Sequence, residues 1–171
     1  MVEEGIERLN SLTHDEAEAE FLQCCGSTAW ACGMSARRPF GGADELMRAA
    51  EEAWGALDDE DWLEAFSRHP RIGESKSATG QTATEKEWSR REQSGAGAAG
   101  GAARRELDDL NRAYAEKFGH IFIVCAAGKS SGEILAALRA RLQNDPASEM
   151  ANAAREQRLI TKLRLGKLLG A

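Results

Sequence analysis

The sequence has few of the residues that build disulfide frameworks or metal centres. Its 171 residues include only four cysteines and three histidines, and no two cysteines form a C-x-x-C pair. Irregularly spaced thiols in a chain of this length indicate reduced residues of a cytoplasmic protein rather than a disulfide scaffold. His14, His69 and His120 have no second ligand at metal-binding spacing, so we predict no metal site. The sequence also has no Gly-rich phosphate loop.

Long apolar runs and a strong positive charge are also missing. No stretch approaches the roughly 18 apolar residues of a membrane-spanning helix, and the acidic N-terminal residues lack the apolar segment of a signal peptide. The formal net charge of −6 disfavours nucleic acid and anionic membrane surfaces, because both would on average be repelled. We therefore expect a cytoplasmic protein without a nucleic-acid or membrane partner.

The sequence is rich in helix signals. In a capping box, a Ser or Thr side chain caps a helix, and a Glu three residues later reaches back to it. Thr13 with Glu16, Thr84 with Glu87 and Ser130 with Glu133 fit this pattern, and a last helix is expected after Pro146. Apolar residues at helical spacing are predicted to face a core. They are Leu46, Met47, Ala50 and Trp54; Leu107, Leu110, Tyr114 and Phe118; Ile134, Leu135, Leu138 and Leu142; and Met150, Ala154, Ile160 and Leu163.

Strand signals are almost absent. Residues 121–124 are β-prone, but the sequence has no second such run to pair with them. Because buried backbone groups must be paired, we expect a buried helix or an extended connector there. The Ala- and Gly-rich residues 94–103 are expected to form a flexible loop. The prediction is an all-α fold, a single domain over residues 1–171 that forms a bundle of about seven to eight helices.

His69 is the first candidate for chemistry because it directly precedes Pro70. A proline restricts the backbone of the residue before it, and Asp58 and Asp59 can open a short helix that Pro70 ends. His69 is therefore expected at a helix end with little backbone freedom. On these residues alone it either complements the helix dipole or is held in place for proton transfer.

A second candidate is the polar set Ser89, Glu92 and Gln93. Spaced at i, i+3 and i+4, these residues share one face of a helix. This face either is solvated or binds a small polar molecule that has amide-like edges.

Two further candidates lie later in the chain. Gly119 permits a positive φ within residues 118–123, so this segment either packs behind a glycine helix cap or lines a pocket with its backbone. Arg164 lies at the border of an apolar stripe. It either covers apolar surface with its stem or binds a substrate carboxylate.

Five groups of residues that include these candidates occur in order at compatible spacings. They are Arg38-Pro39-Phe40, His69-Pro70-Arg71-Ile72-Gly73, Ser89-x-x-Glu92-Gln93, Asn111-x-x-Tyr114-x-x-Lys117-Phe118-Gly119-x-x-Phe122-Ile123, and Arg141-Leu142 followed by Glu149 and Leu163-Arg164-Leu165. From about Phe21 to Leu168 the sequence resembles the OHCU decarboxylase family. OHCU is 2-oxo-4-hydroxy-4-carboxy-5-ureidoimidazoline, the last intermediate between urate and allantoin.

The resemblance implies an all-α, cofactor-independent carboxy-lyase that converts OHCU to (S)-allantoin in urate catabolism and forms a homodimer. It implies His69 as proton donor, with its backbone fixed by Pro70, and Glu92 as the group that sets the charge or tautomer of the imidazole. Arg164 would anchor an anionic or carbonyl oxygen of the substrate. The implied substrate-binding residues are Pro70, Ser89, Gln93, Phe118, Gly119, His120, Ile121, Phe122 and Ile123.

Two other interpretations stay open at this point. One is a non-catalytic helical module that binds a ureide or a partner protein. The other is a decarboxylase for a related ring compound, to which His120 points because the family more often has an aromatic or other apolar residue there.

Overall fold

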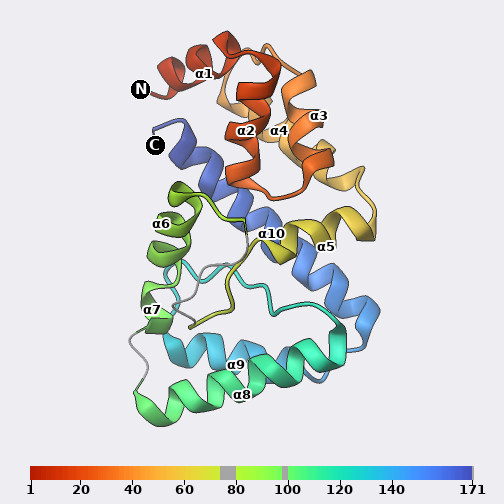
Figure 1. Cartoon of the computed structure of the whole chain (residues 1–171), viewed down its shortest axis with the longest axis vertical. Coiled ribbons are helices and arrows are strands. Elements are labelled where there is room, and N and C mark those ends of the chain that lie inside the picture. The colour runs from red at the N-terminus through yellow and green to blue at the C-terminus, as the bar shows by residue number, and fades with distance from the viewer. Residues whose placement is uncertain (74–79, 98–99, 171) are drawn as a thin grey trace. The chain divides into compact units, whose positions relative to one another are not determined.

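The computed structural model of the chain describes residues 1–73, 80–97 and 100–170, and all regular elements in them are α-helices (Figure 1). The all-α prediction is confirmed, with ten helices in these residues instead of seven to eight. The chain divides into two compact units, residues 1–65 with 158–171 and residues 66–157. A single domain over the whole chain stays a prediction. The helices are α1 (Val2–Ser11), α2 (His14–Cys24), α3 (Thr28–Ala36), α4 (Ala43–Gly55), α5 (Asp59–Ser67), α6 (Ala83–Glu92), α7 (Ser94–Gly97), α8 (Gly101–Phe118), α9 (Ser131–Arg141) and α10 (Pro146–Leu168).

The first unit packs its helices around an aromatic core. The ring of Phe21 meets Trp30 edge-on at 6.0 Å between centroids and meets Phe40 in the same way at 6.3 Å. The indole Nε1 of Trp30 donates a hydrogen bond to the carbonyl oxygen of Ala50 at 3.2 Å, which joins α3 to α4. Edge-to-face aromatic pairs stabilise a core beyond the area that they bury. This core fixes the α2–α3–α4 arrangement.

The cysteines are free thiols, as predicted, and they differ in exposure. Cys24, Cys25 and Cys125 are buried, whereas Cys32 on α3 is exposed. Burial raises the pKa of Cys25 to about 12, against the smaller opposing effect of hydrogen bonds from Ser27 and Thr161. A thiol must ionise to react, so Cys25 is protected both by burial and by its protonation.

We expect one thiol per folded chain to react quickly with Ellman's reagent at pH 8, and that thiol to be Cys32. The three buried thiols should react only at the rate at which the fold opens, and all should react in denaturant. Absorbance gives the stoichiometry, and peptide mass mapping identifies the labelled residue. A disulfide in the mass of the unreduced protein, or fast labelling of a residue other than Cys32, would contradict this assignment.

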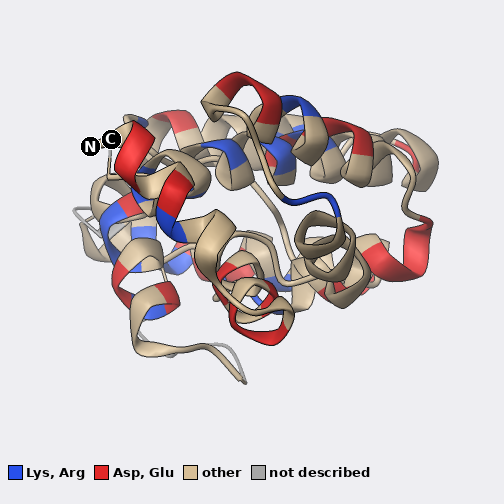
Figure 2. Ribbon diagram, turned by 90° about the horizontal axis from the view of Figure 1, so that it is seen from above, with Lys and Arg blue, Asp and Glu red and all other residues tan. Residues whose placement is uncertain are grey.

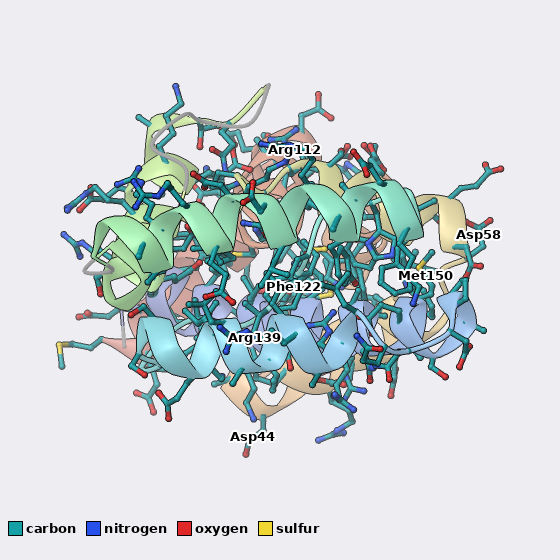
Figure 3. The ribbon with its side chains drawn as sticks, turned by 90° about the horizontal axis from the view of Figure 1, so that it is seen from below. Asp44, Asp58, Arg112, Phe122, Arg139 and Met150 are labelled. Atoms are coloured by element: carbon teal, nitrogen blue, oxygen red, sulfur yellow. The ribbon has the colours of Figure 1, made fainter. Side chains whose placement is uncertain are left out.

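The second unit is built around α8 and α9. Phe122 lies between these two helices in Figure 3, inside an apolar cluster with Leu107, Tyr114 and Leu138. The predicted stripes on α8 and α9 are confirmed, because their members are buried in this cluster or pack against it. The full cluster is Ile72, Ala96, Leu107, Tyr114, Phe122, Val124, Ala126, Ile134, Leu135 and Leu138, with Ala103, Leu110, Phe118, Ala137 and Leu142 packed against it.

Two of the predicted capping boxes are confirmed. The Thr13 hydroxyl accepts from the Glu16 N–H at 3.3 Å, and the Glu16 carboxylate accepts from the Thr13 N–H at 2.9 Å. Ser130 and Glu133 form the same reciprocal pair at the start of α9. The backbone hydrogen bond lowers the pKa of each glutamate.

The third capping box is two residues earlier than predicted. The Thr82 hydroxyl accepts from the Glu85 N–H at 3.2 Å, and the Glu85 carboxylate accepts from the Thr82 N–H at 2.6 Å. Thr84 therefore lies inside α6, and Glu87 binds Arg90 at 2.9 Å on the helix surface. Both threonines are followed by glutamate at the same spacing, so local sequence alone could not choose between them.

The predicted flexible loop over residues 94–103 is largely helical, apart from residues 98–99, which lie outside the described residues. Ser94–Gly97 form α7, and α8 begins at Gly101. A side chain at Gly95 would place its Cβ 2.2 Å from the Lys129 carbonyl oxygen. The glycine therefore permits close packing against the Lys129 backbone. Composition alone predicts a flexible loop here.

The last helix begins at Pro146, and the prediction of its buried face is correct at Ala154 and Ile160 but wrong at Leu163. Leu163 is 40% exposed, while the polar residues Gln157, Thr161 and Arg164 are buried. A pattern based on hydrophobicity places leucine inside and polar groups outside. Polar side chains can occupy the inner face instead when hydrogen bonds satisfy them.

Residues 121–124 form the extended connector that was one of the two expectations for this run. The segment between α8 and α9 carries no helix or strand, and Phe122, Ile123 and Val124 are buried in it. Acidic and basic residues are interspersed along the helices (Figure 2). None of the helices in the described residues is both long and apolar enough to cross a membrane.

Candidate active site

His69 lies just beyond the end of α5, where its N–H donates to the Phe66 carbonyl oxygen at 3.2 Å. Its Nε2 is 2.7 Å from Oε1 of Gln157, a fully buried side chain on α10. An amide oxygen only accepts hydrogen bonds, so Nε2 of His69 carries a hydrogen and donates a hydrogen bond to Gln157. This hydrogen bond fixes the orientation of the imidazole ring.

The loop that follows His69 is held by hydrogen bonds to its backbone. Asn111 Nδ2 donates to the Ile72 carbonyl oxygen at 3.0 Å, and Arg104 Nη2 donates to the Gly73 carbonyl oxygen at 3.2 Å. The Gly73 N–H donates to Oε1 of Gln93 at 3.2 Å. Gly73 has a φ of 86°, which favours glycine. Gln93, predicted to bind substrate, thus positions the histidine loop with its amide oxygen.

The residue before His69 ties the same loop to α6. Arg68 Nη2 binds both carboxylate oxygens of Glu85, at 3.0 and 3.2 Å, and Glu85 is only 1% exposed. Glu85 is also the third residue of α6 and part of its capping box. A buried charge pair with further hydrogen bonds fixes geometry strongly, because breaking it leaves an uncompensated charge. The start of α6 and the His69 loop are therefore held together.

The polar face of α6 carries Ser89 and Glu92. Ser89 is 4% exposed, and its hydroxyl accepts from Gln81 Nε2 at 3.4 Å. Burial raises the pKa of Cys125 against the opposing charge of Lys129, and the charges of Glu156 and Glu92 make smaller contributions that raise it further. Glu156 also accepts the Cys125 N–H at 2.9 Å. Glu92 and Glu156 therefore contribute negative charge near the connector between α8 and α9.

The connector begins at Gly119, the left-handed cap of α8, with a φ of 77°. No atom lies within 4 Å of a Cβ added there, so the positive φ alone accounts for glycine. His120 is buried, and its ring centroid lies 5.4 Å from Phe66 and 5.6 Å from Tyr114. Its Nδ1 is 3.0 Å from the Ile121 carbonyl oxygen, to which it donates. His120 thus packs as an aromatic ring.

A buried polar network supports the far end of the connector. Glu149 is fully buried and accepts from the Tyr114 hydroxyl at 2.6 Å and from Asn144 Nδ2 at 3.0 Å. Arg141 binds the same carboxylate and also donates to the Ile123 carbonyl oxygen. Burial acts to raise the pKa of Glu149, but the hydrogen bonds from Asn144 and Tyr114 and the charge of Arg141 outweigh it and lower the pKa. The ionised carboxylate therefore fixes Arg141 and, through it, Ile123.

The structure places the predicted site residues in two groups. Arg164 belongs to the first unit, where it is 3% exposed and its Nη1 donates to the Gln23 carbonyl oxygen at 3.3 Å. The remaining predicted residues belong to the second unit, where the histidine loop, α6 and the connector come together through the contacts above. They are His69, Pro70, Ser89, Glu92, Gln93, Phe118, Gly119, His120, Ile121, Phe122 and Ile123.

Within the described residues, one group of side chains has the donor atoms and spacing of a metal site. His14, Glu18 and Cys32 each offer one ligand atom, and these atoms lie within 4.8 Å of one another. The prediction that His14 has no second ligand at metal spacing is therefore wrong. Glu18 is one turn further along α2, and Cys32 comes from α3, so the cluster forms only when the two helices pack.

Known proteins are similar to this chain over most of its length. The family model for OHCU decarboxylase matches residues 10–166. The chain is 41% identical over 155 residues to an Arabidopsis thaliana protein named uric acid degradation bifunctional protein TTL, covering 88% of this chain but only 47% of that protein. It is 31% identical over 173 residues to the 2-oxo-4-hydroxy-4-carboxy-5-ureidoimidazoline decarboxylase of Amia calva, covering 96% of this chain and 94% of that enzyme.

A solved structure extends the similarity to three dimensions. The crystal structure of OHCU decarboxylase in the presence of (S)-allantoin superimposes with a TM-score of 0.76 and 36% identity, covering 89% of this chain and 98% of that one. Because the family model spans nearly all of the sequence and the fold agrees, the chain belongs to the OHCU decarboxylase family.

Proposed function

We propose that the protein is a carboxy-lyase that converts OHCU to (S)-allantoin in urate catabolism. Its family supports this function, and the observation that carries it is the environment of His69. The imidazole is held at Nε2 by a buried amide, and its loop is fixed by hydrogen bonds at Ile72 and Gly73. A positioned acid–base group of this kind suits a proton transfer to one face of a small ring.

The substrate can lose CO₂ without a cofactor because it carries its own electron sink. When the C4–carboxylate bond breaks, its electron pair enters the ring toward the adjacent C=N, and CO₂ departs. The ring nitrogen of that C=N takes a proton, which gives an enol at C4. The C4 hydroxyl then becomes a carbonyl as it loses its own proton, and the ureido-bearing carbon takes a proton, so one proton is consumed overall. The enzyme has to hold the breaking bond perpendicular to the conjugated ring and to deliver the new proton to one face only.

In this proposal His69 supplies the proton, and its bond to Gln157 fixes the orientation of the imidazole. Glu92 favours the charged imidazole through its negative charge. Ser89, the amide of Gln93 and the backbone from Gly119 to Ile123 bind the polar edges of the ureido group and the ring. The further contacts of the proposed pocket come from Pro70, Phe118, His120, Ile121 and Phe122. Arg164 is proposed as the anchor for an anionic or carbonyl oxygen, as the resemblance implies.

The packing of His120 bears on the choice of substrate. Its ring occupies an aromatic cluster with Phe66 and Tyr114 and bonds its own neighbour's carbonyl oxygen. It therefore packs as would the aromatic or other apolar residue that the family more often has at this position. This observation favours OHCU over a different ring compound.

We further propose that the protein acts as a homodimer in the cytoplasm and that its reaction needs no metal, nucleic acid or membrane. The homodimer rests on the family resemblance, and the free thiols fit a reducing compartment. Light scattering on the purified protein gives its mass in solution. A monomer at micromolar concentration would contradict the dimer.

The function is tested by generating OHCU in situ from urate with the two upstream enzymes. With the protein present, OHCU should disappear faster than it does spontaneously, and the product should be a single enantiomer, (S)-allantoin. Ultraviolet absorbance follows the substrate, and circular dichroism follows the chirality of the product. Loss of OHCU at the spontaneous rate with a racemic product would instead support a non-catalytic binding module.

A further inference from the structure

We propose that His14, Glu18 and Cys32 form a binding site for Zn²⁺ on the surface of the α2–α3 helix pair. The proposed decarboxylation uses none of the three, and all belong to the first unit. An imidazole nitrogen, a carboxylate oxygen and a thiolate sulfur are the donors that zinc takes in proteins. Mg²⁺ and Ca²⁺ prefer oxygen ligands only, so this mixed set selects a transition metal.

The three ligand atoms lie slightly further apart than they would around a bound zinc ion. Zinc bonds of about 2.0–2.3 Å place tetrahedral ligand atoms roughly 3.4 Å apart. His14 Nδ1 and Glu18 Oε2 are 3.8 Å apart, and all three ligand atoms lie within 4.8 Å of one another. The side chains of His14 and Glu18 are 50% and 27% exposed, so small rotations can close the site. Water can then occupy the fourth position.

The backbone beneath the site is fixed before any metal binds. The capping box of Thr13 sets the first turn of α2. The Ser35 hydroxyl on α3 donates to the His14 carbonyl oxygen at 2.9 Å, and Arg38 Nη2 donates to the Thr13 carbonyl oxygen at 3.1 Å. These bonds hold the end of α3 against the start of α2. Metal binding therefore has to order only side chains, which lowers its entropic cost.

The charge balance also favours a divalent cation. On binding, Cys32 releases its thiol proton to solvent, and its thiolate together with the Glu18 carboxylate neutralises the two positive charges of zinc. Asp15 Oδ1 lies 3.9 Å from His14 Nδ1 and adds negative potential beside the site. The metal would connect α2 to α3 and, because the unfolded chain lacks the cluster, would stabilise the folded protein.

The exposed thiol of Cys32 provides a direct readout that does not depend on enzymatic activity. We expect an equimolar amount of Zn²⁺ to slow the reaction of Cys32 with Ellman's reagent at least tenfold, and excess EDTA to restore the original rate. In His14→Gln and Glu18→Gln, the same amount of zinc should protect Cys32 at least tenfold less. Glu20→Gln is the matched control, since it removes a carboxylate from the same helix that pairs with Arg8 and lies outside the cluster.

Cobalt identifies the ligands spectroscopically. Co²⁺ bound to the parent protein should show a thiolate-to-metal charge-transfer band, which Cys32→Ser abolishes and Glu20→Gln retains. Circular dichroism confirms that each variant is folded. The absence of this band in the parent, or equal zinc protection in His14→Gln, Glu18→Gln and Glu20→Gln, would overturn the proposed site. Neither result bears on the decarboxylation, so the two proposals fail independently.

Discussion

His69→Asn should lower kcat by about 10²- to 10⁴-fold, the contribution of a positioned acid–base group, while KM changes far less. Asparagine keeps a side-chain N–H that can donate to Gln157, but it has no proton to release near neutral pH. The fold should persist, because His69 is only partly buried and its loop is also held at Ile72 and Gly73. Steady-state kinetics on OHCU generated in situ measure both constants.

The chirality of the product gives an independent readout of the same residue. Any allantoin that His69→Asn still releases should shift toward the racemate that forms in free solution. His14→Asn is the matched control, because it makes the same substitution at an exposed histidine of the first unit, and it should retain the parental rate and a single enantiomer. A folded His69→Asn protein with parental kcat and enantiopure product would show that His69 does not donate the proton.

The position of His69 could be predicted from sequence, but its partner could not. The Pro70 signal and the acidic start of α5 are local, and the structure ends α5 at Ser67 as they indicate. Gln157 lies far along the chain on α10, and its buried position contradicts the hydrophobic pattern of that helix. The sequence contained one signal for Gln157. It lies two helical turns before Arg164, and this spacing puts the two polar residues on one face of the helix.

The same distinction between local and distant signals holds for the fold. Capping boxes and apolar stripes depend on residues within two turns, and most of those predictions are confirmed. Predictions fail where tertiary contacts determine the local structure. At Gly95, for example, the absence of a side chain allows the Lys129 backbone to pack closely. The His14–Glu18–Cys32 cluster is of this second kind, because it requires two helices to meet. Sequence periodicity shows which face of a helix is apolar, but it does not show which distant group a polar side chain will meet.

Arg141→Met should lower the free energy of unfolding by about 3–5 kcal/mol, more than the loss of an exposed charge pair does. The substitution leaves the fully buried carboxylate of Glu149 without its cation and removes a donor from the Ile123 carbonyl oxygen. Methionine keeps much of the volume of the arginine stem. The loss of stability therefore measures mainly the missing charge and hydrogen bonds. Urea unfolding followed by circular dichroism measures it.

Arg139→Met is the matched control for Arg141→Met, since Arg139 lies on the same helix (Figure 3) and also pairs with a glutamate, Glu106. The side chains of that pair are 55% and 41% exposed, so its loss should cost less than about 1 kcal/mol. The double variant Arg141→Met with Glu149→Met should be more stable than Arg141→Met alone, because it removes the uncompensated buried charge. Equal losses for Arg139→Met and Arg141→Met, or a double variant less stable than the single one, would show that the buried charge network does not hold the connector in place.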